Sequence, residues 1–185
     1  MRIISGKHKG KRLLAPKNLP VRPTTDFAKE ALFNILNNYF DFHQISVIDL
    51  FAGTGNISYE FASRGTTQIT AVEKDSGCVT YISQVSKQLD FPIQTVKSDV
   101  YPFLQKTRQS VDVIFADPPY QFTQDQLEAI IHLVFENDLL QPQGLLVIEH
   151  PKQLDFTSHP YFMEERKYGG SKFTFFEPPA LTGKE

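Results

Sequence analysis

Four acidic residues of this 185-residue chain stand at, or just after, the ends of short apolar runs that are typical of buried strands. They are Asp49, Glu73, Asp99 and Asp117. A carboxylate accepts hydrogen bonds from hydroxyl, amine and amide groups, and its charge attracts a cation. Acids at four successive strand ends indicate a ligand site, whereas one such residue would carry little information.

The stretch DLFAGTGN, residues 49–56, predicts a tight strand-to-helix turn in which Gly53 and Gly55 let the backbone approach a ligand. The Gly-Lys-Ser/Thr ending of a P-loop is missing, and Ser58 stands where the dinucleotide pattern G-x-G-x-x-G needs its last glycine. Because Asp49 precedes the glycines, the turn favours a ligand with a cationic part over a pyrophosphate. A nucleotide-dependent oxidoreductase is therefore disfavoured.

Glu73 and Asp99 each allow a functional and a structural interpretation. Glu73 could accept hydrogen bonds from both hydroxyls of a ribose, as strand-end acids do in nucleotide-binding folds, or it could be a solvated glutamate. Asp99 could accept a hydrogen bond from the exocyclic amine of an adenine, or it could cap the helix that follows. The residues themselves leave both pairs of alternatives open.

The stretch DPPY, residues 117–120, ends the fourth apolar run with two consecutive prolines. Proline fixes the backbone dihedral φ and donates no hydrogen bond, so the segment is rigid. It is either a turn in which Tyr120 packs, or a geometry that a ligand uses. The acids at the other strand ends favour the second interpretation.

The elements that must position these residues alternate between strand-like and helix-like segments. Strands are predicted over residues 46–51, 68–73, 93–97, 112–117 and 144–150, and helices over 56–64, 75–90, 100–108 and 123–139. Apolar strands separated by helices indicate a parallel sheet covered on both faces, with ligands bound at the carboxyl ends of the strands. Two further strands around Gly169 and Gly170 predict an antiparallel C-terminal hairpin. The fold class is thus α/β, with a seven-stranded, mostly parallel sheet.

A helix rich in apolar residues at helical spacing precedes the first strand, over residues 28–39, and Thr25 or Asp26 is placed to cap it. Near the last strands, Glu149 and His150 are interpreted as structural residues, with a catalytic role as the alternative. The aromatic residues of the hairpin, including Tyr168, are interpreted as its core, with a base-stacking platform as the alternative.

The charge is unevenly distributed along the chain. The net charge is −2, yet the first 22 residues carry seven basic residues and no acid, which leaves 12 basic and 21 acidic residues for the rest. A basic arm suggests contact with a polyanion, because Lys and Arg neutralise phosphates; a solvated tail is the alternative. Candidate RNA-binding residues are Arg2, Lys7, Lys9, Lys11, Arg12 and, beside the hairpin turn, Lys172. Gly6 and Gly10 predict a small hairpin within the arm.

The composition argues against several other classes of protein. No apolar run approaches about 18 residues, so no membrane span is predicted, and the basic N-terminus lacks the apolar segment of a signal peptide. Cys78 is the single cysteine, which excludes an internal disulfide and suits the cytoplasm. The five histidines show no metal-ligand spacing, and we expect no metal site.

The acids, the glycine turn and DPPY together resemble the Rossmann-like class I S-adenosylmethionine-dependent methyltransferases. Their amino-methylating branch carries an Asn/Asp-Pro-Pro-Tyr/Phe motif at this strand end. The flanking stretches are similar to those of the bacterial 16S rRNA guanine-N2 methyltransferases of the RsmD type, in the right order and over nearly the whole chain. These stretches are MRIISGKHKGKRL, RPTTDFAKEALFNIL, DLFAGTGNISYEFASRG, DVIFADPPY and KYGGSKFTFF.

The resemblance implies S-adenosylmethionine as cofactor and a role for each matching residue. Asp49 and the backbone of residues 51–55, which include Phe51, Gly53 and Gly55, would hold the methionine end. Glu73 would bind the ribose hydroxyls and Asp99 the adenine amine. Residues 1–25 would form an arm that contacts RNA and closes over the cofactor through Arg22 and Thr24, ahead of a methyltransferase domain at 26–180.

The resemblance also implies how DPPY would act. The Asp117 carboxylate and the Pro118 carbonyl would each accept one hydrogen of an exocyclic amine, which aims the nitrogen lone pair at the sulfonium methyl group. Tyr120 would stack on a base turned out of its helix. The family's activity is named for guanine 966 of 16S rRNA, within the small ribosomal subunit or an assembly intermediate.

Two alternatives remain beside the guanine-N2 activity. An adenine-N6 methyltransferase acting on RNA or DNA would share the proline motif, which does not distinguish the two amines. A non-catalytic nucleic-acid binder would not need the four acids. We expect a monomer.

Overall fold

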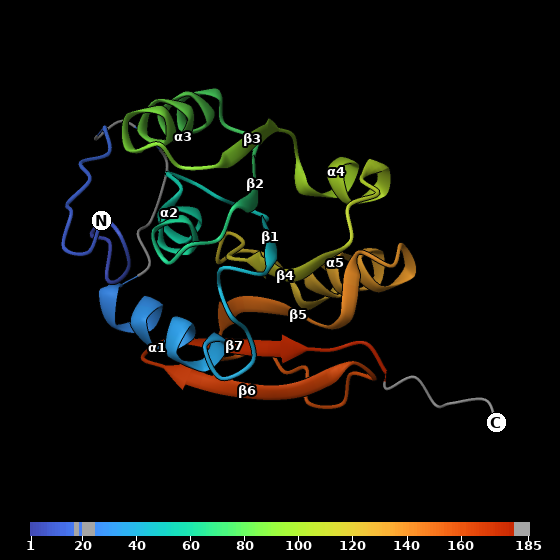
Figure 1. The fold of residues 1–185 in the computed structure, drawn as a ribbon. Coiled ribbons are helices and arrows are strands. Elements are labelled where there is room, and N and C mark those ends of the chain that lie inside the picture. Colours follow the sequence, from blue (N-terminus) through green and yellow to red (C-terminus); the bar gives the residue numbers. More distant parts are fainter. Residues whose placement is uncertain (17–18, 20–24, 180–185) are drawn as a thin grey trace.

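A seven-stranded sheet lies at the centre of the molecule, and the computed structural model describes residues 1–16, 19 and 25–179 around it (Figure 1). The strand order is β3-β2-β1-β4-β5-β7-β6. The first five strands in this order are parallel to one another, and β7 runs antiparallel to both of its neighbours, β5 and β6, which confirms the predicted fold class. The strands are β1 (Ser46–Asp49), β2 (Gln68–Glu73), β3 (Ile93–Lys97), β4 (Val111–Ala116), β5 (Leu140–Pro151), β6 (Phe162–Tyr168) and β7 (Ser171–Phe176).

Within the described residues, five helices cover the two faces of this sheet. They are α1 (Asp26–Leu36), α2 (Asn56–Ser63), α3 (Ser76–Leu89), α4 (Val100–Lys106) and α5 (Gln124–Glu136). Of the two caps that the sequence offered for α1, Thr25 is the one used: its side chain accepts a hydrogen bond from the amide of Ala28. No helix in the described part of the chain is both long and apolar enough to cross a bilayer.

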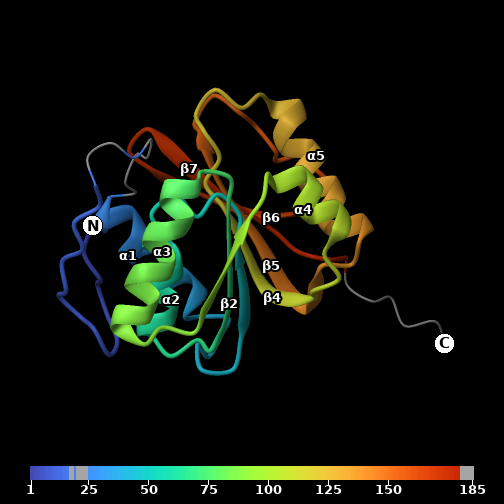
Figure 2. The same cartoon turned by 90° about the horizontal axis from the view of Figure 1, so that it is seen from above.

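The helices α1, α2 and α3 lie on one side of the sheet, and α4 and α5 on the other (Figure 2). Alternate residues of the strands pack on these two faces. Val113 and Phe115 of β4 belong to the core cluster that includes residues of α1, α2 and α3. Their neighbours Ile114 and Ala116 belong to the cluster that includes residues of α4 and α5. A strand-end residue is therefore directed to one face or the other by its place in this alternation.

This alternation sends the acids of four adjacent strands to the same face. Asp49 pairs in register with Ala71 on β2 and with Phe115 on β4, and Phe115 pairs with Val147 on β5. The residue two places further along each of these three neighbouring strands is an acid. These residues are Glu73, Asp117 and Glu149.

Candidate active site

A cavity of about 920 Å³ opens at the carboxyl ends of the parallel strands. Its walls come from the turn after β1, the ends of β2 and β5, the loops after β3 and β4, the first turn of α1 and the β6–β7 turn. The predicted site residues that line it are Asp49, Phe51, Gly53, Glu73, Asp99, Asp117, Pro118 and Tyr120. Gly55 is not a lining residue, but it is the N-cap of α2, between Thr54 and Asn56, which both line the cavity. Arg22 and Thr24 are outside the described residues, although the adjacent Thr25 lines the cavity.

Asp49 is almost fully buried at the inner end of the cavity. One of its carboxylate oxygens accepts two hydrogen bonds from Ser58, from the hydroxyl at 2.6 Å and from the backbone amide at 3.2 Å. Burial raises the pKa of Asp49 to about 6, and the hydrogen bonds from Ser58 oppose that rise. Ser58 stood out in the sequence only as a departure from the dinucleotide pattern, and its function as the partner of Asp49 was missed.

The turn after β1 is an unusual piece of backbone. Phe51 has φ 117°, a value that non-glycine residues rarely adopt, and for this reason β1 ends at Asp49 and not at residue 51 as predicted. Gly55 has φ 86°, and a Cβ atom there would lie 2.6 Å from the ring of Tyr59. The glycine is therefore required by conformation and by space.

Glu73 holds this turn against the end of β2. One carboxylate oxygen accepts a hydrogen bond from the amide of Gly53 at 2.9 Å, and the other accepts from the amide of Asp75 at 2.8 Å. Each carboxylate oxygen has a second lone pair, so the two hydroxyls of a ribose remain possible donors. Asp99 fits both of its interpretations, because it lines the cavity and its side chain also caps α4 by accepting from the amide of Tyr101.

The DPPY segment leaves β4 directly into the cavity. Pro118 is buried, whereas Tyr120 is 44% exposed at the cavity wall. The segment is closed by a hydrogen bond from the amide of Phe122 to the carbonyl of Pro119 at 2.9 Å. The ring of Phe122 also packs edge-on against Phe51, with centroids 5.5 Å apart, so the proline segment and the turn after β1 support each other.

Aromatic side chains line the cavity on two sides. Phe27, in the first turn of α1, is 71% exposed and lies edge-on to Tyr168 of the hairpin at 6.1 Å. Tyr168 also packs on Phe173 at 5.5 Å, so it belongs to the hairpin core, as predicted, and to the cavity wall as well. Exposed aromatic faces of this kind can stack on unpaired bases.

The two strand-end residues interpreted as structural lie in different places. His150 points away from the cavity, where one ring nitrogen lies 2.7 Å from the hydroxyl of Thr174. Glu149, by contrast, lines the cavity and accepts a hydrogen bond at 3.0 Å from the hydroxyl of Ser171. The position of His150 agrees with the structural interpretation, whereas the position of Glu149 fits both a structural and a functional one.

Neither nucleophilic catalysis by a cysteine nor metal binding has much support among the described residues. Cys78 lines the cavity, but burial raises the pKa of its thiol to about 12, so it stays protonated at neutral pH and is a poor nucleophile. No group of three or more His, Cys, Asp or Glu residues in the described ranges is arranged to hold a metal ion.

The described part of the N-terminal arm packs against the α/β domain. The predicted small hairpin is present: Arg2 and Arg12 form an antiparallel bridge, and the amides of Ile3 and Leu13 donate to the carbonyls of Lys11 and Met1 at 2.9 and 3.0 Å. Ile3 and Leu13 of the arm are buried in the same core cluster as residues of α1 and α2. The ring of His8 packs edge-on against Phe91 at 5.0 Å.

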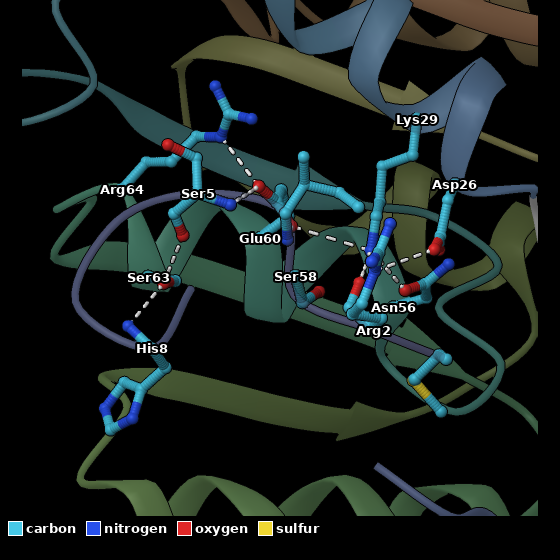
Figure 3. Close-up of polar contacts among 12 residues, drawn as sticks. Arg2, Ser5, His8, Asp26, Lys29, Asn56, Ser58, Glu60, Ser63 and Arg64 are labelled. Atoms are coloured by element: carbon cyan, nitrogen blue, oxygen red, sulfur yellow. Dashed lines mark hydrogen bonds and ion pairs between the residues drawn. The ribbon is translucent and has the colours of Figure 1, made fainter. Parts of the chain in front are cut away.

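A buried ion network on α2 holds this arm, as Figure 3 shows. The carboxylate of Glu60 accepts hydrogen bonds from the backbone amides of Ile4 and Ser5, at 2.8 and 3.0 Å. It also forms ion pairs with Lys29 of α1 at 3.5 Å and with Arg64 at 2.8 Å. Lys29 and Glu60 are both fully buried, so the charge of Lys29 depends on Glu60, whereas Glu60 is also neutralised by Arg64.

Lys29 links three elements. Its ammonium group donates hydrogen bonds to the backbone carbonyl of Arg2 at 2.5 Å and to the side chain of Asn56 at 2.8 Å, in addition to its ion pair with Glu60 (Figure 3). Asn56 is the first residue of α2 and lines the cavity. The arm, α1 and the cavity wall therefore meet at one buried charge.

Five basic residues in the described part of the arm remain at the surface although the backbone around them is docked. Arg2, Lys7, Lys9, Lys11 and Arg12 are all exposed. Lys172 differs from them: it is only 8% exposed, and its ammonium group lies 3.0 Å from the carboxylate of Glu165. The expectation that Lys172 joins the basic surface does not agree with this position, and we leave it out of that surface.

Comparison with known proteins agrees with this geometry. A family model described as conserved hypothetical protein 95 matches residues 1–177. The ribosomal RNA small subunit methyltransferase D of Haemophilus influenzae is 33% identical over 160 residues, covering 82% of this chain and 79% of that protein. The solved structure of a hypothetical protein of Thermus thermophilus, TTHA0928, has a TM-score of 0.83 at 29% identity, covering 96% of this chain and 99% of that one.

A more distant structure, the Thermus thermophilus 16S rRNA N2 G1207 methyltransferase with AdoMet and guanosine, is 21% identical. It has a TM-score of 0.70 and covers 87% of this chain and 45% of that one, so it shares the fold. The chain therefore belongs to the matched family, that of the RsmD-type rRNA methyltransferases, which confirms the class I fold and the S-adenosylmethionine cofactor expected from its motifs.

Proposed function

We propose that this protein transfers a methyl group from S-adenosylmethionine to the exocyclic N2 of a guanine in 16S rRNA. One observation carries the proposal: the rigid Asp117–Pro118 segment lines the same cavity as Asp49, the turn after β1 and Glu73, which holds that turn. A cofactor held by the turn and an amine held by the segment would meet there. A cavity of about 920 Å³ is within the range of natural ligand pockets.

The residues around the turn fit the cofactor's chemistry. Asp49 offers a buried carboxylate to a cationic amino group, and the glycine-containing backbone beside it allows a close approach. Glu73 would accept from the ribose hydroxyls and Asp99 from the adenine amine. Arg22 and Thr24 would close over the methionine side as part of the arm.

The residues of the proline segment would act on the amine. When bound, S-adenosylmethionine supplies an electrophilic methyl group on a sulfonium. The Asp117 carboxylate and the Pro118 carbonyl each accept one amine hydrogen, which frees the nitrogen lone pair from the ring and directs it at that methyl group. Asp117 then accepts the proton that the methylated nitrogen releases and passes it to solvent. Tyr120 stacks on the base during the reaction.

The basic surface of the arm supports an RNA substrate. Five exposed cations on a docked backbone can neutralise phosphates without a large ordering cost, since the arm is already held by Glu60. The Haemophilus relative is named a small subunit methyltransferase. We take guanine 966 as the target, in the small subunit or its assembly intermediate, with the protein acting as a cytoplasmic monomer.

Labelled cofactor tests this function directly. Small subunits from a strain that lacks the modification are incubated with the protein and radiolabelled S-adenosylmethionine, and the labelled nucleoside is identified after digestion. N2-methylguanosine is the expected product. N6-methyladenosine would establish the adenine alternative, and the absence of label would indicate a binding protein.

A variant of Asp117 tests the mechanism. Asp117→Ala is expected to lower the methylation rate by at least ~10²-fold, because one oriented electrostatic partner is lost. The affinity for S-adenosylmethionine, measured by calorimetry, should stay at the wild-type value. A near-normal rate in this variant would remove Asp117 from the mechanism.

A further inference from the structure

The proline segment accepts an amine but does not distinguish guanine from adenine, because both carry an exocyclic NH₂ group. The ring atom beside that amine does distinguish them. Guanine presents an N1–H donor next to its N2 amine, whereas adenine presents an N1 lone pair next to its N6 amine. A second hydrogen-bond acceptor beside Asp117 would therefore fit guanine and oppose adenine.

Glu149 is such an acceptor by the register of the sheet. Ala116 of β4 pairs with Ile148 of β5, so the next residues along the two parallel strands, Asp117 and Glu149, are neighbours. Parallel strands lie about 4.8 Å apart. Phe115 and Val147, two residues earlier, both pack on the face that α1, α2 and α3 cover, and Asp117 and Glu149 both line the cavity on that face.

The carboxyl group of Glu149 is held in position before any ligand arrives. It is buried, and one of its oxygens accepts the hydrogen bond from the Ser171 hydroxyl at 3.0 Å. Ser171 lies at the start of β7, two residues before Phe173, which pairs directly with Glu149. Because a hydrogen bond and a paired strand fix it, the side chain loses little entropy on binding a base.

We propose that Glu149 is the specificity-determining residue of this site and accepts the N1–H of guanine while Asp117 accepts from the N2 amine. The inference rests on the proposed function, whose target amine it explains. An adenine in the same place would direct a lone pair at the Glu149 carboxyl group, so a buried acceptor would meet another acceptor. A site built to hydrogen-bond a donor rejects an analogue without that donor by up to about 10⁴–10⁵-fold.

The base 2-aminopurine separates this role from a structural one. It keeps the amine at C2 that is methylated but has a lone pair at N1, and it also lacks the O6 of guanine. The substrate is 16S rRNA joined from two fragments, with guanine or 2-aminopurine at the target position, reconstituted into small subunits. The wild-type protein is expected to methylate guanine at least ~10²-fold faster than 2-aminopurine.

The variant Glu149→Gln should reduce this preference at least tenfold, because the glutamine amide can donate to N1 of 2-aminopurine. The matched control is Ser171→Ala, which removes the hydrogen bond between the two strands but keeps the carboxyl group. It is expected to slow both substrates by the same factor and leave the preference unchanged. Calorimetry with S-adenosylmethionine verifies that each variant is folded.

Two results would overturn the inference. One is that the wild-type protein methylates guanine and 2-aminopurine at nearly the same rate, a comparison that no folding defect of a variant can affect. The other is a Glu149→Gln variant that slows both bases equally, which would reduce Glu149 to an anchor of the hairpin turn. In both cases guanine is still methylated and the proposed function stands. If the wild-type protein does not methylate guanine at all, the proposed function itself fails.

Discussion

Replacing Lys29 by methionine should release the N-terminal arm while leaving the sheet domain folded. Methionine keeps much of the length and apolar character of the buried side chain but removes its charge and its three donors. The carbonyl of Arg2 and the side chain of Asn56 lose their donor, and the buried carboxylate of Glu60 loses one of its two ion pairs. The damage is thus concentrated where the arm is attached.

The size of the effect follows from the burial of this pair. Removing one partner of a buried ion pair costs about 3–5 kcal/mol. The apolar docking of the arm rests on Ile3 and Leu13, each of which contributes about 1.5–3 kcal/mol when buried. The cost of removing the ion-pair partner is comparable to the free energy that the burial of Ile3 and Leu13 contributes to docking. We therefore expect the arm to undock before the sheet unfolds.

Hydrogen exchange measures this release residue by residue. The amides of Ile4 and Ser5 donate to Glu60, and a loss of about 3 kcal/mol corresponds to a fall of about 10²-fold in their protection. The amide of Val113, in the middle of β4, should keep its protection. The matched control is Lys11→Met, the same substitution at an exposed position of the arm, with an expected change within about 0.5 kcal/mol.

The reasoning would be refuted if Lys29→Met and Lys11→Met gave the same protection at Ile4 and Ser5. It would also be refuted if protection at Val113 fell together with that of the arm, because the network would then stabilise the whole domain.

Three further predictions concern the cavity. Asp49 loses its charge as the pH falls through its raised pKa of about 6. The affinity for S-adenosylmethionine, measured by calorimetry, should therefore weaken about tenfold between pH 7 and pH 5. Asp49→Asn should abolish this pH dependence. Gly55→Ala should lower the melting temperature more than Gly10→Ala, because both have φ above 80° but only the first meets the ring of Tyr59; equal losses would exclude the clash. Phe27→Ala should leave stability within about 0.5 kcal/mol and weaken binding of single-stranded RNA about tenfold; unchanged RNA affinity would contradict a stacking role.

The sheet and most of the cavity could be predicted because their signals are local. Apolar runs separated by helical segments allow few topologies, and a parallel sheet brings its strand ends to one edge. Asp49, Glu73, Asp99 and Asp117 therefore met in the structure as the sequence indicated. The boundary of β1 was wrong because the conformation of Phe51 depends on the turn and not on its own preference for strands.

The rest depends on pairing between distant segments, which no local pattern reveals. Glu149 is a neighbour of Asp117 only through the register of β4 and β5. Lys29 and Glu60 look in sequence like charges on an exposed helix face, and they are buried because the arm covers them. Lys172 likewise looked exposed beside a turn, but it lies buried next to Glu165.

The short helix α2 connects the proposed cofactor site with the basic arm that is proposed to bind RNA. All of its residues after the first are buried. Through Ser58 it holds Asp49 on the cavity side, and through Glu60 and Ser63 it holds the backbone of the basic arm on the other. A substitution that shifts the backbone of α2 should therefore disturb the Asp49 contact and the attachment of the arm together. Lys29 lies outside this helix and does not line the cavity, so it is a position at which attachment of the arm can be weakened while Asp49 keeps its partner.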